Sequence, residues 1–258
     1  MPELSEVETY KKYIDKTSIG HVVKDVKIRD ERILKLSEEL FVKALKNNKF
    51  EDTIRHGKYL LIKLKDQFLI MHFGMTGDLE YFEKAIDEPK YTKVLFKFTN
   101  GRFLSYISKR LFGHLDLTTS VEDFLAKKKL GPDAYKMSWN EFKKALIKRT
   151  AIMKSALLNQ SIFAGIGNIY SDEILFQSKL NPKRKINSLD ENELKELFQN
   201  IKKVLQYGID FKGKLEKYSK DLLIPHRTKN GECPKCTSKL ERYEISGRHG
   251  FFCPKCQK

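Results

Sequence analysis

The sequence predicts an α+β protein built from three successive parts: an N-terminal antiparallel β domain with flanking helices, a helical domain and a C-terminal zinc hairpin. Three observations predict this order. Runs of β-branched and aromatic residues separated by turn signals fill the first half, helical periodicity follows, and paired cysteines occupy the end. The predicted domains cover residues 1–119, 120–225 and 226–258.

The N-terminal domain is expected to begin with a helix over Ser5–Lys16, where apolar residues recur at helical spacing and Ser5 with Glu8 forms a capping-box pattern. Alternation over 23–28 then predicts a strand, and Ser37 opens a second helix that ends near Asn47. Further strands are predicted over Lys58–Leu64, Phe68–His72, Lys93–Phe98 and Arg102–Ile107, with a turn at Asn100-Gly101.

Within the predicted helical domain, the character of the sequence changes near Gly131-Pro132, and the periodicity is helical from Trp139 to Gly208. Four helices are predicted, over residues 139–148, 150–158, 170–178 and 189–207. Residues 208–230 are basic and weakly patterned, and we expect them to form a connector to the zinc hairpin.

The cysteines of the chain all lie near its end, in two identical Cys-Pro-Lys-Cys segments. Cys233, Cys236, Cys253 and Cys256 have the spacing of a structural zinc site, in which each pair supplies two thiolates and the residues between them form a hairpin. The alternatives are two disulfides, which suit small secreted scaffolds, or a redox dithiol, which does not come in duplicate. The sequence thus predicts one structural Zn²⁺ and a reducing intracellular compartment.

The charge of the chain favours an anionic partner. Its 258 residues include 50 basic and 34 acidic side chains, a formal net charge of +16. Such an excess suits nucleic acid or an anionic membrane surface, and solvated lysine-rich faces are the plain alternative. No apolar run is long enough to span a membrane, and the first residues lack the pattern of a signal peptide.

Pro2 directly follows the initiator methionine, which is normally removed before a small residue. Removal leaves a secondary amine that can attack an electrophilic sugar carbon and form an iminium, as in Schiff-base catalysis. The pKa of an α-amino group lies near 8, so more of it is neutral than for lysine. Glu3 and Glu6 can then move protons, although acidic residues at a helix start are also ordinary partners of the helix dipole.

The segment Gly165-Ile166-Gly167-Asn168-Ile169-Tyr170 separates two helical patterns. Its glycines allow a tight turn and close approach of a phosphate to backbone N–H groups, with Asn168 expected to cap the following helix. A helical hairpin without a ligand is the alternative.

Two further segments carry residues that suit a disturbed base stack. They are His72-Phe73-Gly74-Met75-Thr76-Gly77 and Arg110-Leu111-Phe112-Gly113. Exposed Met75, Arg110 and Phe112 at loop tips could fill the hole left by a flipped nucleotide. The alternative is that Met75 and Phe112 belong to the core.

Taken in order, these motifs resemble bacterial formamidopyrimidine-DNA glycosylases over essentially the whole chain. The motifs that carry the resemblance are Pro2-Glu3-Leu4, Glu6-Val7-Glu8-Thr9, His56-Gly57-Lys58-Tyr59-Leu60, the two glycine-containing segments at 72–77 and 165–170, and the four-cysteine tail. The resemblance implies a β-sandwich catalytic domain, a helix–two-turns–helix DNA-binding domain and a zinc finger. It also implies a bifunctional DNA glycosylase and AP lyase of base excision repair.

The resemblance further implies a role for each matching residue. Pro2 is the expected nucleophile at C1′, Glu3 moves protons and Glu6 holds the flipped sugar. Lys58, His72, Asn168 and Arg248 are expected to bind phosphates around the lesion, and Lys154 matches another basic, DNA-binding position of the helical domain. Met75, Arg110 and Phe112 are expected to fill the void in the duplex. The catalytic set is thus Pro2, Glu3, Glu6, Lys58 and Arg248, and the other residues bind DNA.

Three positions depart from the family pattern. Ser5 stands where proline is usual, and Leu111 replaces a second arginine. Residues 211–226 replace a longer glycine-containing loop that covers an extruded 8-oxoguanine. The preference among formamidopyrimidines, 8-oxoguanine and oxidised pyrimidines therefore stays open.

Two alternatives to the leading hypothesis stay open at this point. One is an endonuclease VIII-like preference for oxidised pyrimidines, and the other is a non-catalytic zinc-ribbon protein that binds DNA. The expected partner is damaged double-stranded DNA, with no membrane. The expected state is a monomer in the cytoplasm, associated with the nucleoid through DNA.

Overall fold

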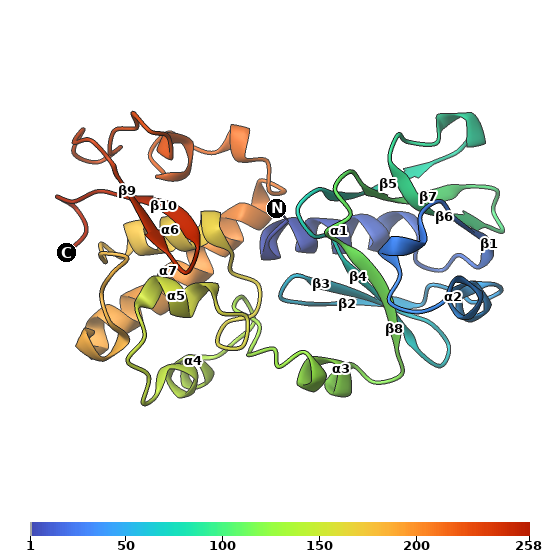
Figure 1. Cartoon of the computed structure of the whole chain (residues 1–258), viewed down its shortest axis with the longest axis horizontal. Coiled ribbons are helices and arrows are strands. Elements are labelled where there is room, and N and C mark those ends of the chain that lie inside the picture. The colour runs from blue at the N-terminus through green and yellow to red at the C-terminus, as the bar shows by residue number, and fades with distance from the viewer. Residues whose placement is uncertain (1) are drawn as a thin grey trace. The chain divides into compact units, whose positions relative to one another are not determined.

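A computed structural model describes residues 2–258, which divide into two compact units (Figure 1). The first unit contains Pro2 and Glu6–Lys128, and the second contains Glu3–Ser5 with Lys129–Lys258. Helix α1 (Leu4–Thr17) therefore begins with residues that belong to the second unit and continues in the first. Each unit has a hydrophobic core of its own.

The first unit is built on two four-stranded antiparallel sheets, which Figure 1 shows as two layers. One sheet has the strand order β1-β6-β7-β5 and the other has the order β2-β3-β4-β8. The strands are β1 (Val23–Ile28), β2 (Asp52–His56), β3 (Tyr59–Lys63), β4 (Phe68–His72), β5 (Gly77–Phe82), β6 (Thr92–Phe98), β7 (Phe103–Ser108) and β8 (His114–Thr118).

Both sheets bury an apolar face in one core, because successive side chains of a strand point to opposite faces. Val7 of α1 and Phe41 of α2 (Glu38–Leu45) complete this core, and both are inaccessible to solvent. The other face of the second sheet is covered by α3 (Val121–Lys127), whose Phe124 packs with Leu61 and Ile70. The remaining helices of this unit are α2 (Glu38–Leu45), α3 (Val121–Lys127) and the 3₁₀ turns η1 (Glu31–Ile33) and η2 (Ala85–Asp87).

The core of the second unit contains helix α6 (Asn168–Gln177), which is buried from Tyr170 to Phe176. The helices are α4 (Trp139–Leu146), α5 (Met153–Leu158), α6 (Asn168–Gln177) and α7 (Glu191–Asp210), with 3₁₀ turns η3 (Ile186–Ser188), η4 (Leu215–Lys217) and η5 (Ile224–His226). A hairpin of β9 (Glu241–Ile245) and β10 (Arg248–Phe252) ends the chain. Among the described residues, no helix has both the length and the apolar character to cross a membrane.

The predicted fold class is confirmed: antiparallel sheets, a helical region and a terminal hairpin are all present. The structure adds β2, β5, β8 and α3, which are short or alternate with charged residues and so gave weak patterns. The predicted connector is partly helical, since α7 runs to Asp210 and two 3₁₀ turns follow. The boundaries after residues 119 and 225 stay predictions.

The predicted capping box at the first helix is wrong. Ser5 lies inside α1, and its hydroxyl donates to Leu205 O at 3.1 Å. Glu8 accepts instead from Arg55 Nε at 2.6 Å. Tertiary partners have therefore displaced the local pairing that the sequence pattern predicts.

Candidate active site and nucleic-acid contacts

Glu3 is hydrogen-bonded to the beginning of helix α6 in the second unit. Its carboxylate accepts hydrogen bonds from the backbone N–H groups of Gly167 at 2.7 Å and Ile169 at 2.9 Å, with Tyr170 at 3.4 Å. The first N–H groups of a helix have no partner within the helix and carry its positive end, so a carboxylate there is stabilised. Only 2% of Glu3 is exposed.

The cap of α6 therefore comes from a distant residue, and the prediction that Asn168 caps this helix is wrong. Asn168 is the first helical residue, and Gly167 in the cap position has no side chain to offer. A Cβ atom at Gly167 would lie 2.2 Å from the carboxyl carbon of Glu3. The glycine that the sequence pattern suggested for a phosphate thus makes room for Glu3.

The backbone after Pro2 is held by the same segment. Leu4 N donates to Gly165 O at 3.1 Å, and the Leu4 side chain is buried in the core of the second unit. Pro2 itself is half-buried, and Glu6 is half-buried in the first turn of α1. Met1 lies outside the described residues, so its removal stays a prediction.

The four cysteines converge as predicted. Their sulfur atoms all lie within 4.8 Å of one another, with Cys233 Sγ to Cys256 Sγ at 3.8 Å and Cys236 Sγ to Cys253 Sγ at 3.5 Å. A tetrahedron of thiolates about 2.3 Å from zinc has edges of roughly 3.8 Å, so the set fits the metal. No disulfide joins these thiols within residues 2–258. The alternative of two disulfides is therefore wrong.

Asn168 and Arg248, two of the predicted phosphate contacts, both lie in the second unit. Arg248 is exposed at the start of β10. Asn168 Nδ2 donates to His249 O on the same strand at 2.8 Å. The structure thus links the beginning of α6 to the strand that carries Arg248.

Lys154, which is also predicted to bind DNA, is completely buried. Its Nζ donates to Asn168 O at 3.1 Å, to Ser171 Oγ at 2.7 Å and to Asp172 Oδ1, which uses all three N–H bonds. Burial lowers the pKa of Lys154, and the charge of Asp172 opposes this shift. A direct contact of Lys154 with DNA stays a prediction, whereas its contact with Asp172 is a feature that sequence reasoning missed.

Met75 and Phe112 are exposed loop residues of the first unit, so the alternative that they belong to its core is wrong. Their exposed fractions are 41% and 54%, and the Arg110 guanidinium lies 4.9 Å from the Phe112 ring centroid. Arg110 N also donates to Thr76 Oγ1 at 3.1 Å, which ties the two loops together. Leu111, at the departure from the family pattern, has a φ of 56° and packs against the core.

The two loops approach each other closely because each contains a glycine at the point of contact. A Cβ atom at Gly74, whose φ is 56°, would lie 2.3 Å from the backbone of Phe112 and Gly113. A Cβ atom at Gly113 would lie 2.1 Å from the Tyr106 hydroxyl. Any other residue at either position would separate the loops and move Met75 relative to Phe112.

His72 ends β4 as a neutral imidazole. Burial, together with the charges of neighbouring cations including Lys58, lowers its pKa to about 3. Its ring stacks on His114, with centroids 5.0 Å apart. In the protein without DNA, His72 is therefore an uncharged hydrogen-bonding group at neutral pH.

Lys58 lies in the turn between β2 and β3, which a buried ion pair supports. Arg55 is buried, donates from Nη1 to Gly57 O at 3.2 Å and pairs with Glu8. Sequence reasoning missed this pair, because a basic residue in a strand gives no sign that it is buried.

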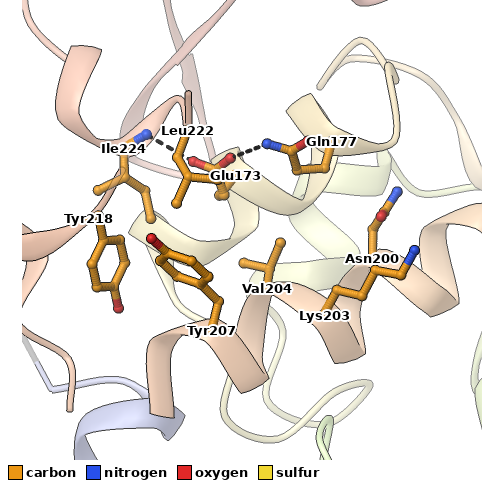
Figure 2. A pocket seen from close by; sticks show the side chains of 9 residues that line it. All are labelled: Glu173, Gln177, Asn200, Lys203, Val204, Tyr207, Tyr218, Leu222 and Ile224. Carbon is orange, nitrogen blue, oxygen red and sulfur yellow. Dashed lines mark hydrogen bonds between the residues drawn. The ribbon is translucent and has the colours of Figure 1, made fainter. Parts of the chain in front are cut away.

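Residues 211–226 are hydrogen-bonded to α6 through Ile224 and to α7 through Ser219, whose N–H donates to the Tyr207 hydroxyl, beside a pocket of about 270 Å³ (Figure 2). Glu173 accepts from Ile224 N at 2.8 Å and from Gln177 Nε2 at 2.7 Å, as the dashed lines in Figure 2 show. The hydroxyls of Tyr170 and Tyr218 lie 2.7 Å apart. Both Glu173 and Tyr170 belong to α6, so the segment is bonded to this helix at Ile224 and at Tyr218.

A β unit with exposed cationic and apolar loop residues, followed by a helical unit with a four-cysteine finger, defines a basic zinc-finger protein suited to nucleic acid. Known protein families match it in three successive segments. The formamidopyrimidine-DNA glycosylase N-terminal domain matches residues 1–115, the formamidopyrimidine-DNA glycosylase H2TH domain matches residues 130–219, and the zinc finger found in FPG and IleRS matches residues 232–258.

Full-length relatives and solved structures agree with these matches. Formamidopyrimidine-DNA glycosylases of Heliobacterium modesticaldum and Streptococcus mutans are 36% and 32% identical, each over 100% of both chains. Lactococcus lactis Fpg in complex with abasic-site DNA superposes with a TM-score of 0.89 at 28% identity and covers 99% of both chains. Its complex with N7-benzyl-Fapy-dG DNA gives the same score and identity over 100% of both chains.

The chain therefore belongs to the formamidopyrimidine-DNA glycosylase family, an enzyme family of base excision repair. The family predicted from the sequence motifs is confirmed, and so is the structural zinc finger. The roles of individual residues stay predictions.

Proposed function

We propose that this chain excises oxidised bases from double-stranded DNA and then cleaves the strand at the resulting site. The observation that carries the proposal is the attachment of Glu3 to the N-terminus of α6, directly after Pro2 in the sequence. A nucleophile must be held in one place to act on a sugar carbon, and the bond from Leu4 to Gly165 holds the following backbone.

With Met1 removed, the Pro2 nitrogen attacks C1′ of the damaged nucleotide and the bond from C1′ to the base breaks. The base leaves with a proton, and ring opening gives an iminium between Pro2 and C1′. Glu3 donates and accepts the protons of these steps. Because the iminium acidifies the C2′ proton, β-elimination expels the 3′ phosphate, and δ-elimination then expels the 5′ phosphate.

The remaining predicted residues are proposed to bind the duplex around the lesion. Lys58, His72, Asn168 and Arg248 bind phosphates, which position the DNA without reading its sequence. Met75, Arg110 and Phe112 fill the space that the extruded nucleotide leaves. Their exposure in the first unit supports this role.

The proposed substrates are formamidopyrimidines and 8-oxoguanine, with a preference for oxidised pyrimidines as the second candidate. The attachment of residues 211–226 at Ile224 and Tyr218 favours the second candidate, because a segment bonded to helices is less able to close over a large purine. Comparing lesions in one assay decides between the two.

Borohydride trapping tests the proposed chemistry. The protein is incubated with duplexes carrying 8-oxoguanine, a formamidopyrimidine or dihydrouracil opposite cytosine or adenine, and borohydride is added to reduce the iminium. A covalent protein–DNA adduct is expected, and its yield ranks the lesions. DNA binding without an adduct on any lesion would establish the non-catalytic alternative and remove the proposal.

Two variants assign the roles within this assay. An uncleaved extension before Pro2 blocks the amine and is expected to abolish adduct formation; an adduct from the extended protein would rule Pro2 out. Glu3→Gln is expected to lower the trapping rate about 10²-fold or more, because it removes a general acid–base group. Glu38→Gln, in the first turn of α2, is the matched control and should not change the rate.

We also propose that the protein acts as a monomer in the cytoplasm, on the nucleoid, without a membrane partner. Its formal net charge of +16 supports attraction to DNA. Analytical ultracentrifugation with and without duplex DNA gives the stoichiometry, and two protein chains per duplex would contradict a monomer.

A further inference from the structure

Asp172, on the buried helix α6, accepts hydrogen bonds from several elements, and the proposed reaction assigns it no role. The residue is 1% exposed and accepts from Lys154 of α5, from the hydroxyl of Tyr243 on β9 and from Phe251 N on β10 at 3.2 Å. Arg227 adds two bonds to Oδ2, from Nε at 2.9 Å and Nη2 at 2.7 Å. One carboxylate thus joins α6 to another helix, to the segment before the zinc finger and to both strands of the hairpin.

The spacing of these bonds matches helix to strand. Asn168 and Asp172 are one helical turn apart on α6, a rise of roughly 6 Å. Their partners on β10, His249 O and Phe251 N, are two residues apart, a rise of roughly 6.6 Å. The two helical side chains therefore bind the strand at residues 249 and 251, one on each side of residue 250.

Gly250, between these two strand positions, allows the close approach. A Cβ atom there would lie 2.7 Å from Asp172 Oδ1 and 2.4 Å from the Tyr243 hydroxyl. A one-residue slip of β10 would place a larger side chain at this point and would turn every side chain of the strand to the other face. The register of β10 on α6 is thus set by hydrogen bonds on both sides of a glycine.

We infer that Asp172 is a positioning residue that fixes the register of β10 on α6 and so presents Arg248 to DNA next to Asn168. The inference rests on the proposed binding of phosphate by Arg248. Asp172 acts on DNA through Arg248 and does not contact DNA itself, because its oxygens are occupied inside the second unit.

A double-mutant cycle on the full-length, zinc-loaded protein tests the inference. Asp172→Asn, Arg248→Ala and the double variant are compared for binding to a duplex with a tetrahydrofuran abasic-site analogue over a range of salt concentrations. Each single variant is expected to weaken binding about tenfold and to reduce the salt slope by about one, the loss expected for one phosphate contact. In the double variant, Asp172→Asn should add less than twofold to the effect of Arg248→Ala.

If the loss of DNA binding in the double variant equals the product of the two single losses, Asp172 acts independently of Arg248, and the inference is overturned. Hydrogen exchange at the Phe251 amide supplies a readout without DNA: Asp172→Asn should accelerate it. Faster exchange with unchanged DNA binding would also overturn the inference. If the unmodified protein does not bind the duplex at all, the proposed function itself fails.

Matched variants separate positioning from loss of the fold. Glu241→Gln changes one exposed carboxylate of the same hairpin and should leave binding within twofold of the unmodified protein. Where Asp172→Asn does not fold or loses zinc, Gly250→Ala disturbs the same register without removing a charge, and its effect should likewise vanish in the Arg248→Ala background. An effect of Gly250→Ala that persists in that background would count against the inference.

Discussion

The two units hold their predicted DNA contacts in different ways. In the first unit, Met75 and Phe112 stand on loops that meet because Gly74 and Gly113 have no side chains. In the second unit, the strand that carries Arg248 is hydrogen-bonded to Asn168 and to the buried carboxylate of Asp172. The first arrangement depends on glycines that leave room for close approach, and the second depends on buried charges that are paired. Different substitutions should therefore disrupt the two.

The largest effect is expected where a buried charge loses its partner. Lys154→Met removes a fully buried cation from Asp172 and should cost about 3–5 kcal/mol of the free energy of unfolding, the range for breaking a buried ion pair. Urea denaturation measures this loss. Lys195→Met is the matched control, since its exposed contact with Glu191 should contribute less than about 1 kcal/mol.

Retention of stability in Lys154→Met would mean that Arg227 alone compensates Asp172, and the contrast between the units would weaken. The trapping assay on the same variant also examines the predicted contact of Lys154 with DNA. A loss of DNA binding without any loss of stability would favour a direct contact over a supporting one.

Local sequence patterns predict much of this arrangement. There is a physical reason why they do not predict the rest. The alternating strands, the helices and the four cysteines each follow from a local pattern. The capping of α6 by Glu3 does not, because the two partners are more than 160 residues apart. Local rules assigned that cap to Asn168 and the first capping box to Ser5, and tertiary partners overrode both.

Asp172 was missed for a related reason. It lies between Ser171 and Glu173 on a helix whose polar and apolar residues are buried alike from Tyr170 to Phe176, so the sequence pattern does not show that it is buried. A charged residue inside such a segment is itself informative, because a buried carboxylate must be paired. That rule could have marked Asp172 and Glu173 as candidates, although it could not have named Tyr243 or Arg227 as their partners.

A smaller effect is expected from overcrowding in the first unit. Gly113→Ala places a methyl group against the Tyr106 hydroxyl and His72 O, and should cost about 1–3 kcal/mol of stability, as overpacking usually does. It should also lower the trapping rate, since the loop that carries Phe112 must move. Thermal denaturation and the trapping assay measure the two effects.

Tyr106→Phe provides a compensating change for Gly113→Ala. Removing the hydroxyl takes away the nearest atom, so the double variant should regain part of the stability that Gly113→Ala loses. If the double variant is less stable than the sum of the two single losses predicts, the overlap with Tyr106 is not the cause and the steric account of this unit is wrong.

The smallest effect is expected from pH, and it should have opposite signs in the two units. Burial lowers the pKa of His72 to about 3 and of His114 to about 4, from an ordinary value of 6.5. At pH values between the folded-state pKa and 6.5, the unfolded chain binds more protons than the folded one. The stability of the first unit therefore declines as pH falls below 6.5. In the second unit, burial raises the pKa of Glu173, so the folded state binds the extra proton and gains stability as pH falls towards 4.5.

Hydrogen exchange at pH 7 and pH 5, corrected for intrinsic rates, measures both trends within one protein. Protection is expected to fall in β4 and β8 and to hold or rise in α6. His114→Phe keeps an aromatic ring against His72 but cannot titrate, so it should remove part of the pH dependence in the first unit. The upper limit is about 1.4 kcal/mol per pH unit for one proton, reduced at this partly exposed site by solvent screening. Equal losses of protection in β4 and α6 would show that the two units respond to acid as one, and the contrast in how they are held would not extend to their titration.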